Sequence, residues 1–474
     1  MPTEFIATVS LAAPEEGADG DLASVFSAYT ACATVWLVLA SAVGVILSLK
    51  FPYPDFATTP ALAFGRLRPI HTNDAFYAWA SPALIGLAFY VAARSSGTRL
   101  YSTRLAWVCL TLLNLAAILG TITLELGFND GAQEYREWLW WIRIILAAGL
   151  ITAAWNIIAT VARRDGEDIY LSNWYTMGGT LWTIIIVIVA LLPWYQYGLG
   201  QVAVQGYYMH NAVGMWFTPM SLGVFYYALP KLLNRPIYSY SLGIFAFWTN
   251  LVFYPIIGAH HFIFSPLPWW LQTTAIVFSV AMLVLGWGGS ANFLLTMRGR
   301  PERMYRSPAM FILVAVLSYL LGSTQGTVEA FRSVQSIWHL TNFTVGHSHP
   351  TMYGFITFAV WGGVYALLPR ATGKYPSQLA MGLHFWLATV GVAIYVLSLS
   401  IGATEQGLDW VRGAPFIQSV VDQAPYWLWR TIGGVLMLGG HLVFAGNVWH
   451  MTYGRSRTAA PPKVPASMPI QDTS

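Results

Sequence analysis

The stretch WLWWIRIILAAGLITAAWNIIATV, residues 138–161, holds a single charged side chain, Arg143, in its 24 positions. An α-helix rises 1.5 Å per residue, so about 20 apolar residues cross the hydrocarbon core of a bilayer. Similar stretches recur along the 474 residues, of which 56% are hydrophobic and 9% charged. Soluble proteins average roughly 25% charged residues. The sequence therefore predicts an all-α polytopic membrane protein.

Apolar runs between charged or Pro- and Gly-rich breaks predict twelve spans. They cover residues 27–50, 71–95, 103–126, 138–161, 172–194, 203–230, 239–264, 269–297, 307–328, 342–369, 378–402 and 427–452. We expect one twelve-helix domain over 27–452, preceded by a cytoplasmic segment at 1–26. Residues 453–474 contain Pro and Ser and are expected to form a disordered cytoplasmic tail.

Composition also excludes several classes of protein. The N-terminus lacks the basic region of a secretory signal. Cys32 and Cys109 lie in apolar runs without a CxxCH context, which excludes a disulfide framework and a covalently attached c-type haem. The net charge of +4 is dispersed along the chain, so nucleic acid is not expected as a partner.

The distribution of basic residues predicts the orientation. Of the 24 Lys and Arg residues, 16 fall in loops after even-numbered spans or in the tail, and 8 fall on the other side. Cytoplasmic loops carry the excess of Lys and Arg. We therefore expect both termini on the cytoplasmic side of a bacterial inner membrane.

Six histidines from four spans are predicted to lie at one depth, in the outer third of the membrane. They are His71, His210, His260, His261, His347 and His349. Any one alone is compatible with a hydrogen-bonded residue at a helix interface. Ionisable groups inside a membrane are costly and usually functional, and neutral imidazole is a common ligand of iron and copper. Six at one level predict a metal centre near the periplasmic side.

Spacing separates the roles of these imidazoles. His347 and His349 are two positions apart on a helix, so they point about 200° away from each other and can serve two cofactors. A six-coordinate haem at His349 needs a second ligand from another helix, and His71 is available. The remaining imidazoles are His210, His260 and His261. Three imidazoles with an open position suit copper.

The other four histidines do not fit this pattern. His384 and His450 are predicted near the cytoplasmic side and His441 near mid-membrane, and we expect structural roles for all three. His339, in an outer loop, is a candidate for a hydrogen bond to a haem propionate, with a plain loop histidine as the alternative.

Several motifs together resemble the catalytic subunit of cbb3-type cytochrome c oxidases, in the C branch of the haem-copper oxidase superfamily. The resemblance extends from about Leu62 to Trp449. The motifs are GRLRPIHTND (65–74), YYMHNAVG (207–214), RPIYSY (235–240), GAHH (258–261) and HLTNFTVGHSHP (339–350).

The resemblance implies two haems b and one copper. It implies that His71 and His349 bind the low-spin haem and that His347 binds the high-spin haem. The three remaining imidazoles would hold the copper. Gly214 follows the first copper ligand by four residues, as in the cbb3 branch, where the active-site tyrosine comes from span 7.

Tyr254 occupies the place of that tyrosine in this chain. It precedes His260 by six residues, which puts it about 9 Å deeper along an α-helix. The resemblance implies that its phenol gives an electron and a proton during O–O cleavage.

Four further residues match the family more loosely. Glu134 matches a carboxylate associated with calcium near the propionates, and Arg430 could pair with a propionate. Thr218 and Tyr226 match positions in the proton path from the cytoplasm.

The chain also departs from the family pattern. Gly243 and Ala246 stand where the family has a Ser and a His in the proton path. Gln325 replaces a family Glu near the proximal His347, and Glu329 lies one turn later. These changes leave the proton route and proton pumping open.

We interpret the chain as the catalytic subunit of a terminal oxidase that reduces O₂ to water. Because it has no CxxCH motif, we expect membrane-anchored c-type cytochrome subunits to dock on its outer face, with lipid around the helices. A nitric oxide reductase with iron in place of copper is the first alternative. A secondary transporter without cofactors is the second.

Overall fold

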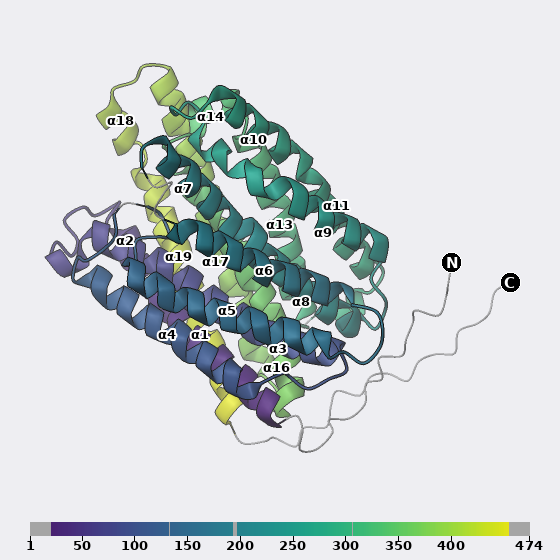
Figure 1. Ribbon diagram of the computed structural model, residues 1–474. Helices are drawn as coiled ribbons and strands as arrows, with labels where there is room; N and C mark the ends of the chain where they lie inside the picture. The colour runs from purple at the N-terminus through teal and green to yellow at the C-terminus, as the bar shows by residue number, and fades with distance from the viewer. Residues whose placement is uncertain (1–19, 132, 193–196, 306, 455–474) are drawn as a thin grey trace.

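The computed structural model describes residues 20–131, 133–192, 197–305 and 307–454, and every regular element within them is a helix. Figure 1 shows a bundle of long helices, with the short helices α2, α14 and α18 at one end. The α-helices are α1 (Gly20–Leu49), α2 (Phe64–Asn73), α3 (Ser81–Ser95), α4 (Thr103–Glu125), α5 (Trp140–Ala162), α6 (Leu171–Leu191), α7 (Leu199–Asn211), α8 (Thr218–Leu233), α9 (Tyr240–Phe253), α10 (Trp269–Ala281), α11 (Leu283–Met297), α12 (Pro301–Met304), α13 (Ala309–Glu329), α14 (Arg332–Trp338), α15 (Phe343–His349), α16 (Phe358–Thr372), α17 (Gln378–Val411), α18 (Phe416–Val421) and α19 (Ala424–Tyr453). The remaining helical elements are the 3₁₀ segments η2 (Pro60–Leu62) and η6 (Tyr254–Phe262) and the π segments η3 (Asp74–Ala80), η5 (Ala212–Phe217) and η7 (Pro350–Thr357).

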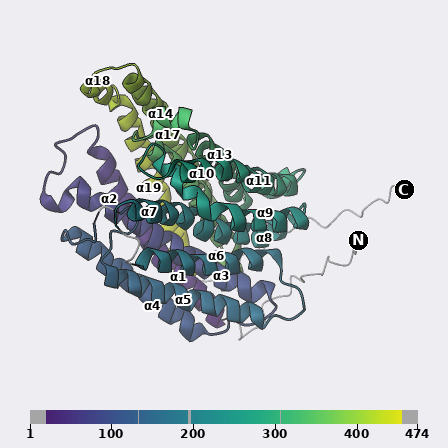
Figure 2. The same cartoon turned by 45° about the horizontal axis from the view of Figure 1, so that its top comes forward.

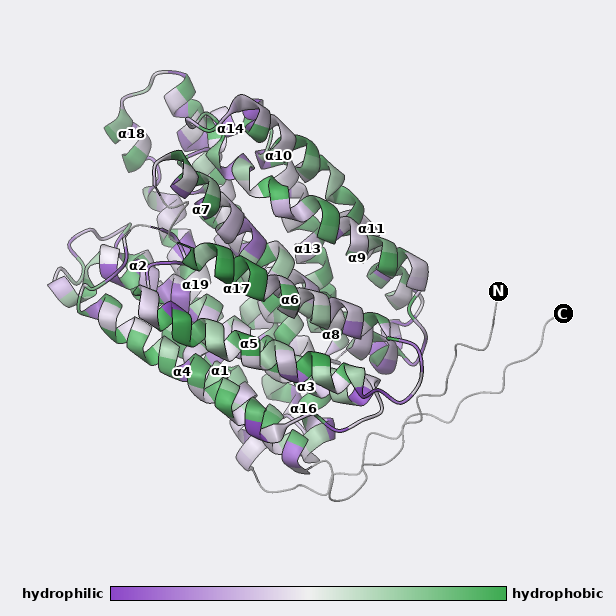
Figure 3. Ribbon diagram, in the orientation of Figure 1, coloured by the Kyte–Doolittle hydropathy of each residue, from purple (hydrophilic) through white to green (hydrophobic). Residues whose placement is uncertain are grey.

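The prediction of twelve membrane spans is confirmed, since twelve helical stretches of the described chain are long and apolar enough to cross a bilayer. Neighbouring spans in the sequence often pack together: α4 lies beside α5 on one edge of the bundle in both views (Figures 1 and 2). Hydrophobic residues cover the middle of the long helices, and hydrophilic residues gather towards their ends (Figure 3). This banding is what a surrounding bilayer requires.

The first helix begins earlier than predicted. It starts at Gly20 rather than at residue 27, so part of the expected N-terminal segment is helical. Leu22, Val25 and Phe26 are buried, because this first part of α1 packs against the bundle before the continuous apolar run begins. Residues 1–19 and 455–474, which include most of the expected terminal segments, lie outside the described residues.

Three spans form the interior of the bundle. They run over Phe64–Ser95, Leu199–Leu233 and Phe343–Thr372, and 94%, 94% and 89% of their most apolar stretch is buried. In the other spans this share is at most 56%, because one face of each meets the membrane. Four of the six candidate ligand histidines come from the three interior spans, and His260 and His261 come from the span Tyr240–Phe262.

Each interior span contains a π segment directly after its ligand histidines. Segments η3, η5 and η7 lie beside Pro82, Pro219 and Pro350. A proline has no N–H and leaves the carbonyl four residues earlier without its helical partner. The backbone then adopts the wider i→i+5 pattern, which is common at functional sites. The sequence analysis did not foresee these segments.

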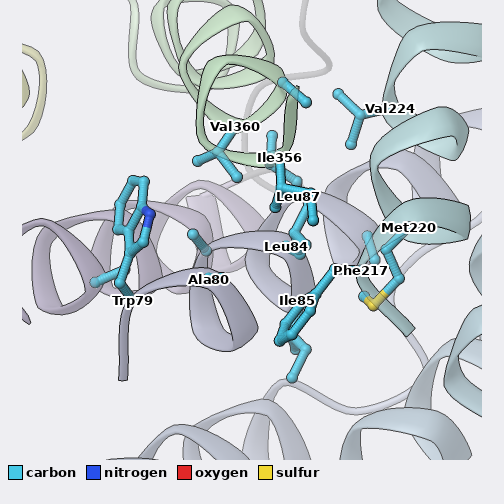
Figure 4. Close-up of a cluster of buried hydrophobic side chains, with 14 of the residues drawn as sticks. Trp79, Ala80, Leu84, Ile85, Leu87, Phe217, Met220, Val224, Ile356 and Val360 are labelled. Atoms are coloured by element: carbon cyan, nitrogen blue, oxygen red, sulfur yellow. The ribbon is translucent and has the colours of Figure 1, made fainter. Parts of the chain in front are cut away.

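The interior spans are held together by interlocking apolar side chains (Figure 4). Leu84 and Leu87 of α3, Met220 and Val224 of α8, and Val360 of α16 belong to one buried cluster. Inside a membrane, packing of this kind rather than water exclusion drives helix association. The cluster therefore fixes the relative positions of the three helices that carry ligands.

Helices α17 and α19 approach each other backbone to backbone at two glycines. A Cβ atom on Gly391 would lie 2.8 Å from the carbonyl oxygen of Gly433, and one on Gly433 would lie 2.7 Å from the carbonyl oxygen of Gly391. Only glycine permits this approach.

We expect Gly391→Val to force the two helices apart, with a cost of about 1–3 kcal/mol or more. The midpoint of thermal unfolding of the purified protein in detergent should fall. Gly382→Val is the matched control on the same helix, because no atom lies within 4 Å of a Cβ there. Equal midpoints for the two variants would contradict the assigned contact.

Candidate metal centre

Three imidazoles converge in the interior of the described chain. One ligand atom from each of His210, His260 and His261 lies within 4.8 Å of the other two. Their ring centroids are 4.5 to 5.1 Å apart. Three neutral imidazoles at this separation can hold one small metal ion with a position left open.

The three imidazoles come from the end of α7 and from the 3₁₀ segment η6. His210 lies at the end of α7, just before π segment η5, while His260 and His261 lie in the 3₁₀ segment η6. A 3₁₀ helix has three residues per turn, so Tyr254 and His260 share one face of η6. The expected α-helical geometry between Tyr254 and His260 is therefore wrong, because this part of span 7 is a 3₁₀ helix.

A hydroxyl fixes the tautomer of His260. Nδ1 of His260 lies 2.7 Å from Oγ of Ser279, and that hydroxyl donates its proton to the carbonyl oxygen of Ala275 at 2.7 Å. Ser279 must then accept from His260, so Nδ1 carries the proton and Nε2 keeps its lone pair. A partner of this kind orients a metal-bound histidine.

Two cavities lie on either side of α15. His347 and the three converging imidazoles line a cavity of about 340 Å³. His71 and His349 line a second cavity of about 130 Å³. Ser348 and Met352 line both and form the wall between them. The two histidines of the HxH pair thus face different cavities, as their spacing predicted.

Backbone carbonyls orient both histidines of the smaller cavity. Nδ1 of His71 lies 2.7 Å from the oxygen of Ala40, and Nδ1 of His349 lies 2.8 Å from the oxygen of Val345. A carbonyl oxygen only accepts, so each Nδ1 is protonated and each Nε2 is free to bind a metal. Gly44 leaves room for the first ring, because a Cβ there would lie 2.7 Å from Cε1 of His71.

Two more ligand candidates carry buried nitrogens with no partner. Nδ1 of His210 and Nδ1 of His347 make no hydrogen bond, although both atoms are buried. Buried polar atoms are nearly always paired, so such an atom calls for an explanation. A metal ligand set supplies one, and the residues present therefore fit the haem and copper that the resemblance implies.

Tyr254 lies in contact with this site. Its ring centroid is 4.7 Å from that of His210, and it lines the larger cavity. A Cβ on Gly214 would lie 1.6 Å from Cζ of Tyr254 and 2.1 Å from its hydroxyl oxygen. The phenol therefore occupies the space in which any side chain at position 214 would lie.

Arg430 is buried near the smaller cavity. Its Nε donates to the hydroxyl of Tyr395 at 3.1 Å, and the Tyr395 ring stacks on His349 with centroids 4.1 Å apart. The Nη1 atom of Arg430 is buried without a partner. A carboxylate oxygen would accept a hydrogen bond from this Nη1 atom.

The carboxylate of Glu134 is paired with a residue to which the sequence analysis gave no role. Nη2 of Arg68 lies 2.5 Å from Oε1 of Glu134, and both side chains line the larger cavity. Arg68 stands three residues before His71, so its place in the GRLRPIHTND motif was the available signal.

His339 is held by a neighbour on α14. Its Nδ1 lies 2.7 Å from Oε1 of Gln335, whose Nε2 donates to the carbonyl oxygen of His260 at 3.5 Å. Partial burial lowers the pKa of His339. Because Nδ1 donates to the amide oxygen, Nε2 of the neutral ring is an acceptor and could not donate to a propionate.

The two candidate proton-path residues occupy different places. Thr218 lines the larger cavity, whereas the hydroxyl of Tyr226 accepts from Nδ2 of Asn292 at 3.4 Å. A Cβ on Gly243 would lie 2.4 Å from Leu171 and 3.1 Å from the Tyr226 hydroxyl. The space that a serine at position 243 would need is filled.

Glu329 is hydrogen-bonded to Thr344, and Nδ1 of His347 has no hydrogen-bond partner. Glu329 is buried and accepts from Oγ1 of Thr344 at 3.4 Å. Oε1 of Gln325 and Nδ1 of His347 both lack partners.

Two of the histidines expected to be structural are fully enclosed in the bundle. His384 and His441 are buried and hydrogen-bonded. His441 also lines the smaller cavity, which the sequence analysis did not predict.

A family model described as "Cytochrome C and Quinol oxidase polypeptide I" matches residues 24–436. The chain belongs to this family. It is therefore a haem-copper oxidase, with haem and copper as cofactors, and the resemblance inferred from the motifs is confirmed. The alternative of a cofactor-free transporter is wrong.

Two relatives cover most of the chain. It is 32% identical over 452 residues to "Cytochrome c oxidase subunit 1 homolog" of Agrobacterium tumefaciens (strain T37), a match that covers 90% of this chain and 84% of the relative. It is 32% identical over 438 residues to "Cbb3-type cytochrome c oxidase subunit CcoN1" of Stutzerimonas stutzeri, covering 88% and 92%.

A solved structure of a heme-copper terminal oxidase dimer superposes with a TM-score of 0.76. The superposition covers 92% of this chain and 85% of that one, at 13% sequence identity. At this identity the likeness concerns the fold, and it confirms the expected architecture of an oxidase subunit I.

We expect Gly214→Ala to displace the Tyr254 phenol from His210 and to lower oxidase turnover by about 100-fold, because small misplacements at a reacting centre cost this much. The visible haem spectrum of the purified protein should be unchanged. The matched control is Gly288→Ala, where the nearest atom to a Cβ is 3.5 Å away. Full turnover of Gly214→Ala would contradict the role of the contact.

Proposed function

We propose that this protein reduces O₂ to water at the larger cavity, with electrons that arrive through the smaller one. The observation that carries the proposal is the pair of histidines on α15. His347 faces the three converging imidazoles across the larger cavity, while His349 faces His71 at the smaller cavity. One helix thus supplies a ligand to each of two neighbouring sites, separated by Ser348 and Met352.

The donor set supports two haems b and one copper. We assign the low-spin haem to His71 and His349, whose Nε2 atoms are both free, and the high-spin haem to His347. We assign the copper to His210, His260 and His261. When bound, these groups supply the one-electron redox steps and the O₂ binding that side chains alone do not.

The surrounding residues orient the candidate ligand histidines and pack around the two cavities. Oγ of Ser279 holds His260, and backbone carbonyls hold both ligands of the low-spin haem. Buried apolar residues of the three interior helices pack around the sites, where charge is weakly screened. Tyr254, beside His210, is placed to release a proton and an electron from its hydroxyl.

We propose that protons reach Tyr254 from the cytoplasmic side through Tyr226 and Thr218. Tyr226 lies two turns along α8 from Thr218, which itself lines the larger cavity. Because Leu171 fills the space beside Gly243, the lower part of this route must differ from that of the family. Proton translocation coupled to turnover is a further part of the proposal.

Electrons enter from outside the chain. With no CxxCH motif in the sequence, we propose membrane-anchored c-type cytochrome subunits as donors, docked at the end of the bundle that carries α2, α14 and α18. This end is taken as periplasmic and both termini as cytoplasmic, following the distribution of Lys and Arg.

Two peripheral assignments complete the proposal. The unpartnered Nη1 of Arg430 is assigned to a haem propionate. Calcium is assigned to Glu134 beside Arg68, and its other oxygen ligands would come from outside this pair, since Ca²⁺ takes six to eight. His339 is retained as a neighbour of the copper ligands rather than as a propionate donor.

Metal analysis of the purified complex tests the proposal directly. For each copy of this chain we expect one copper and two haems b, counted apart from the c-type haems of the donor subunits, with O₂ consumption. Three irons per chain without copper, together with NO consumption, would identify a nitric oxide reductase instead. Measuring both gases on the same preparation separates the two outcomes.

We expect Ser279→Ala to lower the affinity for copper by about 10- to 100-fold, because loss of an outer partner frees the tautomer and orientation of His260. The copper content should fall after dialysis against a chelator, while the haem content stays constant. Ser290→Ala is the control, since its buried hydroxyl makes no hydrogen bond. Equal copper retention in both variants would remove this role from Ser279.

A further inference from the structure

A third cavity, of about 360 Å³, lies at the end of the bundle opposite α18. It is bounded by the start of α1, the end of α3, the start of α4 and the loop between α3 and α4. None of its lining residues belongs to the proposed metal sites or to the path through Tyr226. Sites for small molecules commonly measure about 300–1,000 Å³. The cavity is therefore large enough to hold a ligand.

The walls of this cavity are basic. Arg94, Arg99 and Arg104 line it, and Asp21 is the one carboxylate among its lining residues in the described chain. Three positive charges against one negative charge leave a net charge of +2. Within the described residues, neither Arg99 nor Arg104 takes part in an ion pair. Because guanidinium groups bind phosphate oxygens through two parallel hydrogen bonds, a phosphate is the anion that this lining fits.

The loop that carries Arg99 is fixed by hydrogen bonds to α5. The backbone N–H of Ser102 donates to Oδ1 of Asn156 at 3.0 Å, and Nδ2 of Asn156 donates to the carbonyl oxygen of Ser102 at 2.9 Å. The backbone N–H of Tyr101 donates to Oγ1 of Thr160 at 3.0 Å. Asn156 and Thr160 are fully buried. This wall of the cavity is thus pre-organised, which reduces the entropy lost when a ligand binds.

The rule that places Lys and Arg on the cytoplasmic side explains the sign of these charges but not their arrangement. The rule is satisfied by basic residues anywhere in the short cytoplasmic loops. Like charges repel each other, so arginines that serve only this rule gain nothing from sharing one cavity. The three arginines nevertheless line the same cavity, beside a loop that buried side chains hold in place. A bound anion accounts for this arrangement.

The helix surface next to the cavity is apolar. At 3.6 residues per turn, Trp107, Leu115 and Ile118 lie on the same face of α4 as Arg104, and all three are exposed. This helix lies on one edge of the bundle in both views (Figures 1 and 2), where its exposed face meets lipid. A ligand that carries both a phosphate and acyl chains matches the cavity and this face together. Free phosphate matches the cavity alone.

We propose that this cavity binds the headgroup of an anionic phospholipid. Arg99 and Arg104 contact its phosphate, and its acyl chains lie along the exposed face of α4. Basic pockets between transmembrane helices at the cytoplasmic surface are suited to such headgroups. The bound lipid connects the ends of α1, α3 and α4. The inference is independent of the redox function proposed above, because it needs neither haem nor copper.

The test measures the binding of fluorescent phosphatidylglycerol to the purified whole complex in detergent, with an excess of unlabelled phosphatidylcholine. We expect Arg99→Gln combined with Arg104→Gln to raise the Kd about 30-fold, or about fivefold for each arginine. The matched control combines Arg300→Gln with Arg303→Gln, which removes the same charge from a loop that does not line the cavity. Its Kd should stay within twofold of the wild type.

Equal Kd values for the cavity variant and the control variant would overturn the inference. Arg99→Lys combined with Arg104→Lys separates charge from folding, because it keeps both positive charges. We expect this variant to bind more tightly than the glutamine variant. If the lysine and glutamine variants bound equally weakly, the arginines would be structural and the inference would be wrong.

Two other occupants are outcomes of the same test. If inorganic phosphate bound at Arg99 and Arg104 while phosphatidylglycerol did not, the site would take a free anion and the lipid inference would be overturned. Glu15 and Glu16 precede Asp21 by only a few residues in the sequence. If phosphatidylglycerol bound only after Glu15→Gln and Glu16→Gln, carboxylates of this chain would be the ligands, which would also overturn the inference.

Discussion

Imidazoles that lie inside a membrane bundle must have every polar atom accounted for, and this requirement organises the structure. Water cannot solvate them, so each ring is either hydrogen-bonded or available to a metal. His71, His260 and His349 use Nδ1 for a hydrogen bond and keep Nε2 free. His210 and His347 carry buried nitrogens without partners. A set of metal ligands requires imidazole nitrogens of this kind, which are buried and not already used in a hydrogen bond.

The arrangement of helices follows from the same need for burial. Three spans are enclosed by the others, and these three carry four of the six candidate ligands. Prolines at the π segments account for the wider helix that follows the candidate ligands of each interior span. Glycines complete the fit at single points: Gly44 admits the ring of His71 and Gly214 admits the phenol of Tyr254. The same glycines thus allow the helices to pack closely and leave room for the rings of His71 and Tyr254.

Much of the site could be predicted because few residue types can perform its chemistry. Ten histidines in a hydrophobic chain can be placed individually, and the two-residue spacing of His347 and His349 predicted that they point to different sides of the helix, where each lines a different cavity. The surrounding residues could not be found in this way. Ser279 and Gln335 are ordinary polar residues far along the chain from His260, and only folding brings them to it. His441 was placed at mid-membrane, but its position at a cavity wall was missed because depth says nothing about direction.

The sequence by itself determined the class of the protein, a bundle of twelve apolar spans with histidines inside them. These follow from composition and period, which act locally along the chain. The tertiary structure decided which spans are interior, where 3₁₀ segments replace the α-helix, and which atoms orient each ligand. The interior position of a span and the atoms that orient each candidate ligand depend on contacts between residues tens to hundreds of positions apart, which no local pattern encodes. The π segments instead follow from the prolines beside them.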